Sequence, residues 1–97
     1  MTYGRQVAIA KRKNITDSWL RSRVRMMSND QVELAIAIVQ NKNVTDATIL
    51  DLIRKGISDA NIFFAIAEVT HNEEIAYEIK KYLKKIDLNG IATNGNV

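Results

Sequence analysis

The sequence contains no cysteine and no proline, and its 97 residues include one histidine and four glycines. Without cysteine, disulfide frameworks and thiolate metal sites are excluded, and a reducing compartment such as the cytoplasm is the expected location. No apolar run approaches the roughly 18 residues that a membrane span needs, and the first residues lack a signal-peptide pattern. We therefore expect a cytoplasmic protein with one small domain.

The missing proline also removes the strongest helix breaker, and Gly56, Gly90 and Gly95 lie at or beyond the ends of apolar segments. This distribution is typical of consecutive helices. The apolar runs at residues 34–39 and 62–67 are also compatible with buried strands, but capping residues bracket both runs and no hairpin turn lies nearby. The predicted helices cover residues 4–13, 17–27, 30–41, 46–55, 59–70 and 73–87, in a single domain of residues 1–87, and residues 88–97 are predicted to be a disordered tail.

Start signals mark most of these helices. The stretches KNITD and KNVTD place Thr16 and Thr45 as N-caps, with Asp17 and Asp46 at the positive end of the helix dipole. The other expected caps are Asn72, Ser58 and, for the third helix, Ser28 or Asp30. The repeated stretch therefore predicts two helix starts and not a duplicated functional motif.

An internal repeat of about 30 residues relates the helices to one another. Ala35 and Ala37 align with Ala65 and Ala67, and a third, truncated copy opens the chain at VAIAKRKNITDSWL. A helical hairpin of this size cannot bury its apolar face without a neighbour, so the copies are expected to stack. The sequence therefore predicts an all-α fold of about six short helices in three stacked helical hairpins.

This repeat resembles the short type of HEAT repeat, which is also found in phycobilisome-lyase-like proteins. The resemblance rests on the ND or SD opening with an apolar residue close behind, Val32 or Ile62, on the small AIA segment, and on the second-helix pattern ILDLI. Glu33 and Phe63 stand where the family often has an arginine. The resemblance covers about residues 5–85 and implies a right-handed α-solenoid that binds partners and performs no chemistry itself.

Residues that support catalysis are scarce. The single histidine, His71, lies in the turn before the last predicted helix, whereas a metal site needs three or four converging ligands. Glu73 and Glu74 stand at a helix start, where the helix dipole accounts for them, and no glycine-rich phosphate loop is present. We expect a protein that is not an enzyme and that uses no catalytic residue, metal or cofactor.

Charge is distributed unevenly along the chain. Residues 1–28 carry seven basic residues and one acid, 7 − 1 = +6, whereas residues 29–97 carry seven basic residues and ten acids, 7 − 10 = −3. The basic part fits a loose helix-turn-helix template whose second helix presents Arg21 and Arg25 outward. The candidate residues for binding a protein or nucleic acid are Lys11, Arg12, Lys13, Trp19, Arg21, Arg23 and Arg25.

Arg23 stands out among these candidates because it falls inside the apolar arc of its predicted helix. The later copies place Leu52 and Tyr82 at the same position. Burying an unpaired guanidinium is costly. Arg23 is therefore expected to pair with an acid of the next hairpin or to lie along Trp19, and the alternative is that it faces a partner.

The leading hypothesis for function is a non-enzymatic interaction protein, a small regulator or inhibitor that binds a larger protein. The alternative is a helix-turn-helix regulator that binds DNA or RNA through the basic N-terminal third. A third hypothesis is a homodimer or larger homo-oligomer, because the predicted third and fifth helices are apolar over most of their surface. The opposing interpretation is that these two helices form the middle layer of the domain. No membrane partner is expected.

Overall fold

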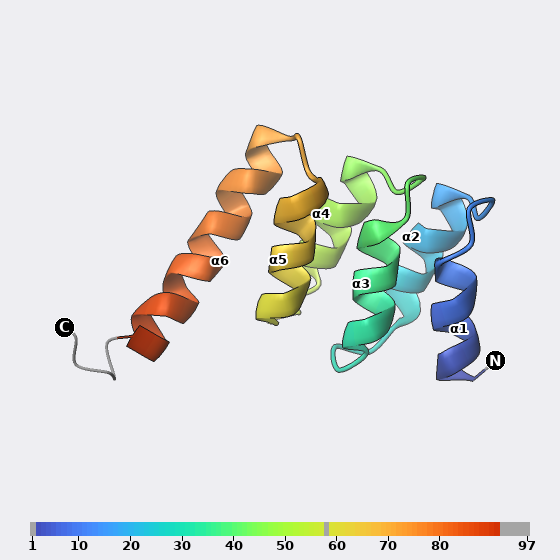
Figure 1. Cartoon of the computed structure of the whole chain (residues 1–97), viewed down its shortest axis with the longest axis horizontal. Coiled ribbons are helices and arrows are strands. Elements are labelled where there is room, and N and C mark those ends of the chain that lie inside the picture. The colour runs from blue at the N-terminus through green and yellow to red at the C-terminus, as the bar shows by residue number, and fades with distance from the viewer. Residues whose placement is uncertain (1, 58, 92–97) are drawn as a thin grey trace.

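The computed structural model describes residues 2–57 and 59–91, with side chains described as far as Lys84, and these ranges contain six α-helices and no strand (Figure 1). The helices are α1 (Tyr3–Ala10), α2 (Asp17–Met26), α3 (Val32–Gln40), α4 (Asp46–Arg54), α5 (Ala60–Val69) and α6 (Glu73–Ile91). Consecutive helices form three hairpins that lie side by side. The predicted all-α fold of three stacked hairpins is confirmed.

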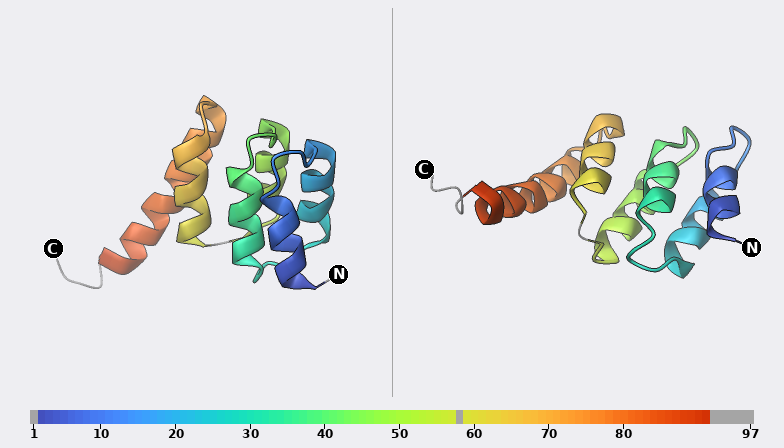
Figure 2. Two further views of the ribbon diagram at one scale, coloured as in Figure 1. Left: turned by 45° about the vertical axis from the view of Figure 1, so that its right-hand side comes forward. Right: turned by 60° about the horizontal axis from the view of Figure 1, so that its bottom comes forward.

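The hairpins form two layers, with α1, α3 and α5 in the first and α2, α4 and α6 in the second (Figures 1 and 2). Helix α3 packs between α1 and α5, and α4 packs between α2 and α6. The C-terminal half of α6 diverges from α5, and the molecule is elongated, with extents of 47 × 29 × 19 Å. Neighbouring hairpins, more than the two helices of one hairpin, therefore supply the main contacts.

The core follows this layering, since the fully buried side chains lie where neighbouring hairpins meet. The largest of them are Phe63, Leu20, Leu34, Ile38, Leu52, Ile62, Ile66, Ile75, Ile79, Val24, Val39 and Thr48. Ala35, Ala37 and Ala65 are buried, and their small side chains allow close helix approach. Ala67, which aligns with Ala37 in the sequence repeat, is exposed, because the described chain places no first-layer helix beyond α5.

The helix caps agree with the sequence in three of five places. Thr16 Oγ1 accepts a hydrogen bond from the amide of Trp19 (3.2 Å), and Thr45 and Asn72 cap α4 and α6 in the same way. Helix α5 is capped by Asp59, whose carboxylate accepts from the amides of Asn61 and Ile62; the predicted cap, Ser58, lies outside the described residues. Gly56 has a φ of 87°, the left-handed conformation that glycine adopts just past a helix end.

The predicted start of the third helix is wrong. Helix α3 begins at Val32 and not at residue 30, because Ser28 and Asp30 hydrogen-bond to each other (2.6 Å) and leave the helix end to another group. That group is the Tyr3 hydroxyl of α1, which accepts from the amide of Leu34 (3.2 Å). A residue of the first hairpin therefore caps the second.

Two other boundaries also differ. Helix α1 ends at Ala10 and not at residue 13, and α6 continues to Ile91, past the predicted end at residue 87. Residues 88–91, which the sequence predicts to belong to a disordered tail, are therefore helical. Residues 92–97, the rest of that predicted tail, lie outside the described residues.

Candidate functional site

The acids of the repeated KNxTD stretch connect neighbouring hairpins. Asp17 Oδ1 accepts from the amide of Thr45 (2.8 Å) and the hydroxyl of Thr48 (2.9 Å), and Asp17 Oδ2 accepts from the Thr45 hydroxyl (3.0 Å). Asp46 repeats the arrangement one hairpin later, where it accepts from the Asn72 side-chain amide (3.1 Å). These carboxylates therefore hold the start of the next second-layer helix, a role that a cap motif alone does not reveal.

Asparagines strengthen the same edge of the stack. The side-chain amide of Asn41 donates to the carbonyls of Ala10 and Arg12 (2.8 Å each), and that of Asn43 donates to the carbonyls of Lys13 and Ile15. Carbonyls beyond the end of a helix need such partners. We name the edge formed by the α1–α2, α3–α4 and α5–α6 turns the turn edge, and its polar network is structural.

The predicted basic cluster Lys11–Lys13 lies on the turn edge, with all three side chains exposed. The arginines of α2 follow along a helix of ten residues, which spans about 15 Å. Arg25, in the last turn of α2, therefore lies far from the cluster. The structure does not unite the seven candidate residues in one site.

Arg21 is held by the second hairpin. Its Nε donates to Asp51 Oδ2 at 2.8 Å, which joins α2 to α4 across the second layer. Both side chains are only partly exposed. The sequence predicts that Arg21 points outward and contacts a nucleic acid. That prediction is incomplete, because the Asp51 carboxylate of the same chain already binds one side of its guanidinium.

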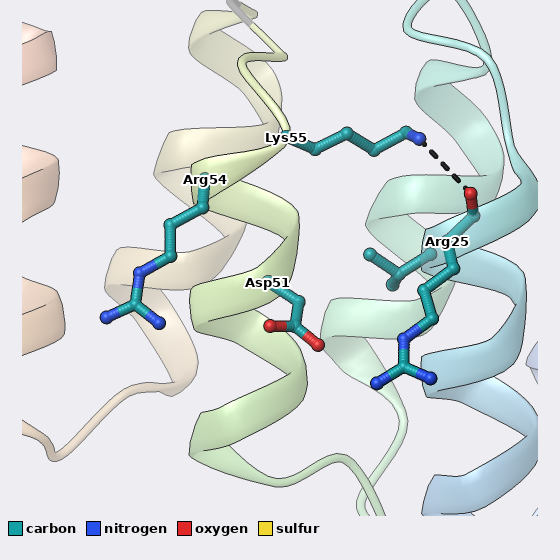
Figure 3. A pocket seen from close by; sticks show the side chains of 5 residues that line it. Arg25, Asp51, Arg54 and Lys55 are labelled. Atoms are coloured by element: carbon teal, nitrogen blue, oxygen red, sulfur yellow. Dashed lines mark hydrogen bonds between the residues drawn. The ribbon is translucent and has the colours of Figure 1, made fainter.

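A groove between α2 and α4 lies beside Asp51, the acid of this ion pair (Figure 3). Its lining consists of Val24, Arg25, Asp51, Arg54 and Lys55. Lys55 reaches across the groove, and its Nζ donates to the carbonyl of Arg25 (3.5 Å), as the dashed line in Figure 3 shows. A second depression, lined by Ser18, Arg21, Ser22, Arg25 and Met26, adjoins it on α2. Arg25 lines both.

This groove, which we call the basic groove, carries uncompensated positive charge. Together with Arg21 it holds four basic residues and one acid, 4 − 1 = +3, and the acid is already paired with Arg21. Within the described residues, neither Arg25 nor Arg54 has a carboxylate at ion-pairing distance. Sequence reasoning found Arg25 but missed Arg54 and Lys55, which come from another hairpin and give no local signal.

Arg23 and Trp19 lie at the N-terminal end of the stack. The Arg23 guanidinium lies over the Trp19 ring, 5.2 Å from its centroid, and Nη1 donates to Gln6 Oε1 at 3.5 Å. Its Nε is buried without a hydrogen-bond partner. No ion pair to a described acid is formed, so of the predicted alternatives the structure contains the stacking on Trp19.

His71 is exposed, and the described residues contain no group of three or more His, Cys, Asp or Glu side chains that is able to hold a metal ion. None of the six helices, over the ranges described, has both the length and the apolar composition of a membrane span.

The fold and these surfaces define an all-α protein of three stacked hairpins with a basic groove across the first two. Comparison with known proteins adds no relative: no family model, curated protein or solved structure matches the chain.

Proposed function

We propose that this chain is a non-enzymatic interaction protein, a small regulator or inhibitor, that binds an acidic segment of a larger protein in the basic groove. One observation carries the proposal: Arg25, Arg54 and Lys55 line a groove whose acid, Asp51, is already neutralised by Arg21. A carboxylate that enters the groove gains charge-assisted hydrogen bonds without displacing an existing pair. The resemblance to short HEAT repeats supports the same class, since it implies partner binding without chemistry.

An acidic peptide suits the groove better than a nucleic acid. Affinity for phosphates grows with the number of cations that reach them, and a protein with about 6–10 phosphate contacts loses affinity steeply as salt rises. Three uncompensated cations predict a salt slope of only about −2.7 for duplex DNA, from about −0.9 per phosphate contact. The small number of uncompensated cations thus favours a protein segment.

The helix-turn-helix alternative fits the geometry less well. A recognition helix places one face in the major groove, which is about 12 Å wide, and reads base edges with outward side chains that are free of other partners. Helix α2 packs against α4, and Arg21 is bonded to Asp51. These contacts favour the protein-binding proposal over the nucleic-acid alternative.

The test is a pair of binding titrations, one with a fluorescent peptide rich in Glu and Leu and one with a fluorescent random DNA duplex, each across a salt series. We expect the peptide to bind, and the double variant Arg25→Glu/Arg54→Glu to weaken it at least tenfold, equivalent to about 1.4 kcal/mol. The matched control, Arg12→Glu/Lys42→Glu, reverses two exposed charges on the turn edge and should retain the affinity.

Equal loss in both double variants would assign the binding to general charge and contradict the groove. Tighter binding to the duplex than to the peptide, with a slope steeper than about −3, would favour the nucleic-acid alternative. Absence of binding to either probe at low salt would leave the groove without its proposed ligand class and reject the proposal.

A further inference from the structure

Three positions in each first-layer helix face the next hairpin. Counted from the helix start, the first, fifth and eighth residues lie on one side of a helix. In α1 and α3 all of them pack against the core, and they are Tyr3, Val7 and Ala10, followed by Val32, Ile36 and Val39. Each set is covered by the first-layer helix of the following hairpin, α3 or α5.

The same positions of α5 are not covered in the described chain. They are Ala60, Phe64 and Ala67, and the Phe64 side chain is 53% exposed. The second layer repeats the pattern: the fifth residue of α2 bonds to Asp51 and that of α4 packs on the core, whereas Tyr77, the fifth residue of α6, is 63% exposed. We call the surface made by these α5 residues and Tyr77 the C-terminal face.

The opposite end of the stack has its own unpaired surface. The third and sixth residues of α3 and α5, which face the preceding hairpin, are buried: Leu34, Ala37, Ile62 and Ala65. In α1 these positions are Arg5 and Ala8, and both are exposed. On α2 the surface continues with Trp19, Arg23 and Met26, of which Met26 is 69% exposed. We call this surface the N-terminal face.

The segments that carry the two faces differ in charge. Residues 59–79 contain five acids and no lysine or arginine, 0 − 5 = −5, whereas the N-terminal face itself carries the two cations Arg5 and Arg23. Phe64 is an exposed aromatic ring, and the N-terminal face carries two guanidinium groups, the pairing that cation–π contacts require. The Tyr77 ring already has Lys81 Nζ 5.5 Å from its centroid, so Phe64 is the ring left for a second copy.

The turn edge offers a further match. Asp17 and Asp46, the first residues of α2 and α4, each bond to the cap residue of the next second-layer helix. Glu73 is the first residue of α6, and Thr16 is the cap of α2. A second copy placed after the third hairpin would therefore bring Thr16 to the position where Glu73 is able to accept its hydrogen bond.

We propose that the C-terminal face of one copy docks on the N-terminal face of a second copy, head to tail, so that the stack of hairpins continues from one chain into the next. Such a contact uses two different surfaces and leaves one of each free at the ends, so it builds a growing series of oligomers unless it closes into a ring. Arg54 and Lys55 lie outside both faces, and the inference is independent of the proposed function.

The test is sedimentation velocity over a concentration series, with two single variants at exposed positions. Phe64→Glu blocks the C-terminal face, and Met26→Glu blocks the N-terminal face. We expect the wild-type mass to rise with concentration and to fall with added salt, and each variant alone to stay monomeric. An equimolar mixture of the two should form a 1:1 dimer, because each variant supplies the face that the other lacks.

Gln40→Glu is the matched control, since it adds one negative charge at an exposed position of α3 outside both faces, and it should associate as the wild type does. Circular dichroism of every variant verifies that it is folded. A wild-type chain that remains monomeric up to about 1 mM overturns the proposal. It is also overturned if Met26→Glu still associates, which a two-fold contact through the C-terminal face would produce, or if the mixture stays monomeric, which would mean that the two faces do not bind each other.

Discussion

At the N-terminal end of the stack Arg23 occupies the position that Leu52 fills in the second hairpin, whereas at the C-terminal end the side chains of Phe64 and Tyr77 are exposed. Arg23 is the seventh residue of α2, and Phe64 and Tyr77 are the fifth residues of α5 and α6. In the middle of the stack the same helix positions are packed against neighbours. The contrast shows that one repeat pattern yields a core or a surface according to what lies beside it.

The ends also differ in how their polar groups are satisfied. Arg23 has one long hydrogen bond to Gln6 and a ring beneath it, and its Nε has no hydrogen-bond partner. The C-terminal face has no comparable buried polar atom in the described residues, and it has exposed rings instead. The N-terminal end therefore presents a guanidinium on an aromatic ring, and the C-terminal end presents exposed aromatic side chains.

The largest effect should follow from placing an arginine, the residue found at this position in the first hairpin, in the middle of the stack. Leu52→Arg introduces a guanidinium at a position that is 1% exposed, and no described acid pairs with it there. An uncompensated buried charge costs about 3–5 kcal/mol, so urea unfolding should show a loss of this size or an unfolded chain. Leu52→Met, which nearly conserves volume, is the control and should cost less than about 1.5 kcal/mol. If Leu52→Arg lost less than about 1.5 kcal/mol of stability, the side chain at position 52 would not be shielded from solvent in the way the structure indicates.

The two junctions between hairpins differ in a way that a second measurement can resolve. Asp17 accepts three hydrogen bonds from the second hairpin, whereas Asp46 accepts one from the third. Removing a carboxylate acceptor costs about 1.5–3 kcal/mol in a partly buried network and less at an exposed bond. We expect about 2 kcal/mol for Asp17→Ala and about 0.5 kcal/mol for Asp46→Ala in urea unfolding.

Equal losses for the two alanine variants would show that both acids act through the helix dipole of their own helix and not through the next hairpin. Asp17→Asn separates these contributions, because it removes the charge and keeps one acceptor oxygen. It should recover part of the stability lost in Asp17→Ala.

Much of this fold is encoded locally, and its errors arise where tertiary contacts intervene. Periodicity and caps located all six helices, since Thr16, Thr45 and Asn72 act within their own turns. The start of α3 was misplaced because the Tyr3 hydroxyl, 31 residues away from Leu34, supplies the cap. No local pattern contains that information.

The sequence alignment of the repeats is wrong for the helix pair α4 and α6. The turn before α4 covers residues 41–45 and that before α6 covers residues 70–72, so α6 begins two residues early relative to the sequence repeat. Counted from the helix start, the equivalent of Leu52 is the buried Ile79 and not Tyr82. Tyr82 instead stacks on Phe63, with ring centroids 4.9 Å apart.

The candidate site was less predictable than the fold for the same reason. Arg25 is prominent in a basic segment, but the groove exists only because α4 brings Arg54 and Lys55 beside it. Arg21 looked equivalent to Arg25 in the sequence, and Asp51 separates their roles. A surface assembled from two hairpins cannot be read from either one.

A gain in stability, smaller than the losses expected at Leu52 and Asp17, should come from the reverse exchange at the N-terminal end. Arg23→Leu removes a cation–π contact worth about 0.5–1 kcal/mol and a hydrogen bond at the limit of its range, but it also removes a buried Nε whose missing partner costs about 1–3 kcal/mol. We expect a net gain of about 0.5–1 kcal/mol, measured as a rise in Tm of the monomeric variant Met26→Glu/Arg23→Leu over Met26→Glu alone, so that association does not contribute.

In the otherwise unchanged chain, Arg23→Leu should at the same time weaken head-to-tail association, because it removes a guanidinium from the N-terminal face. A loss of stability would instead assign Arg23 to the internal packing of the first hairpin, and a gain without weaker association would remove it from the docking surface.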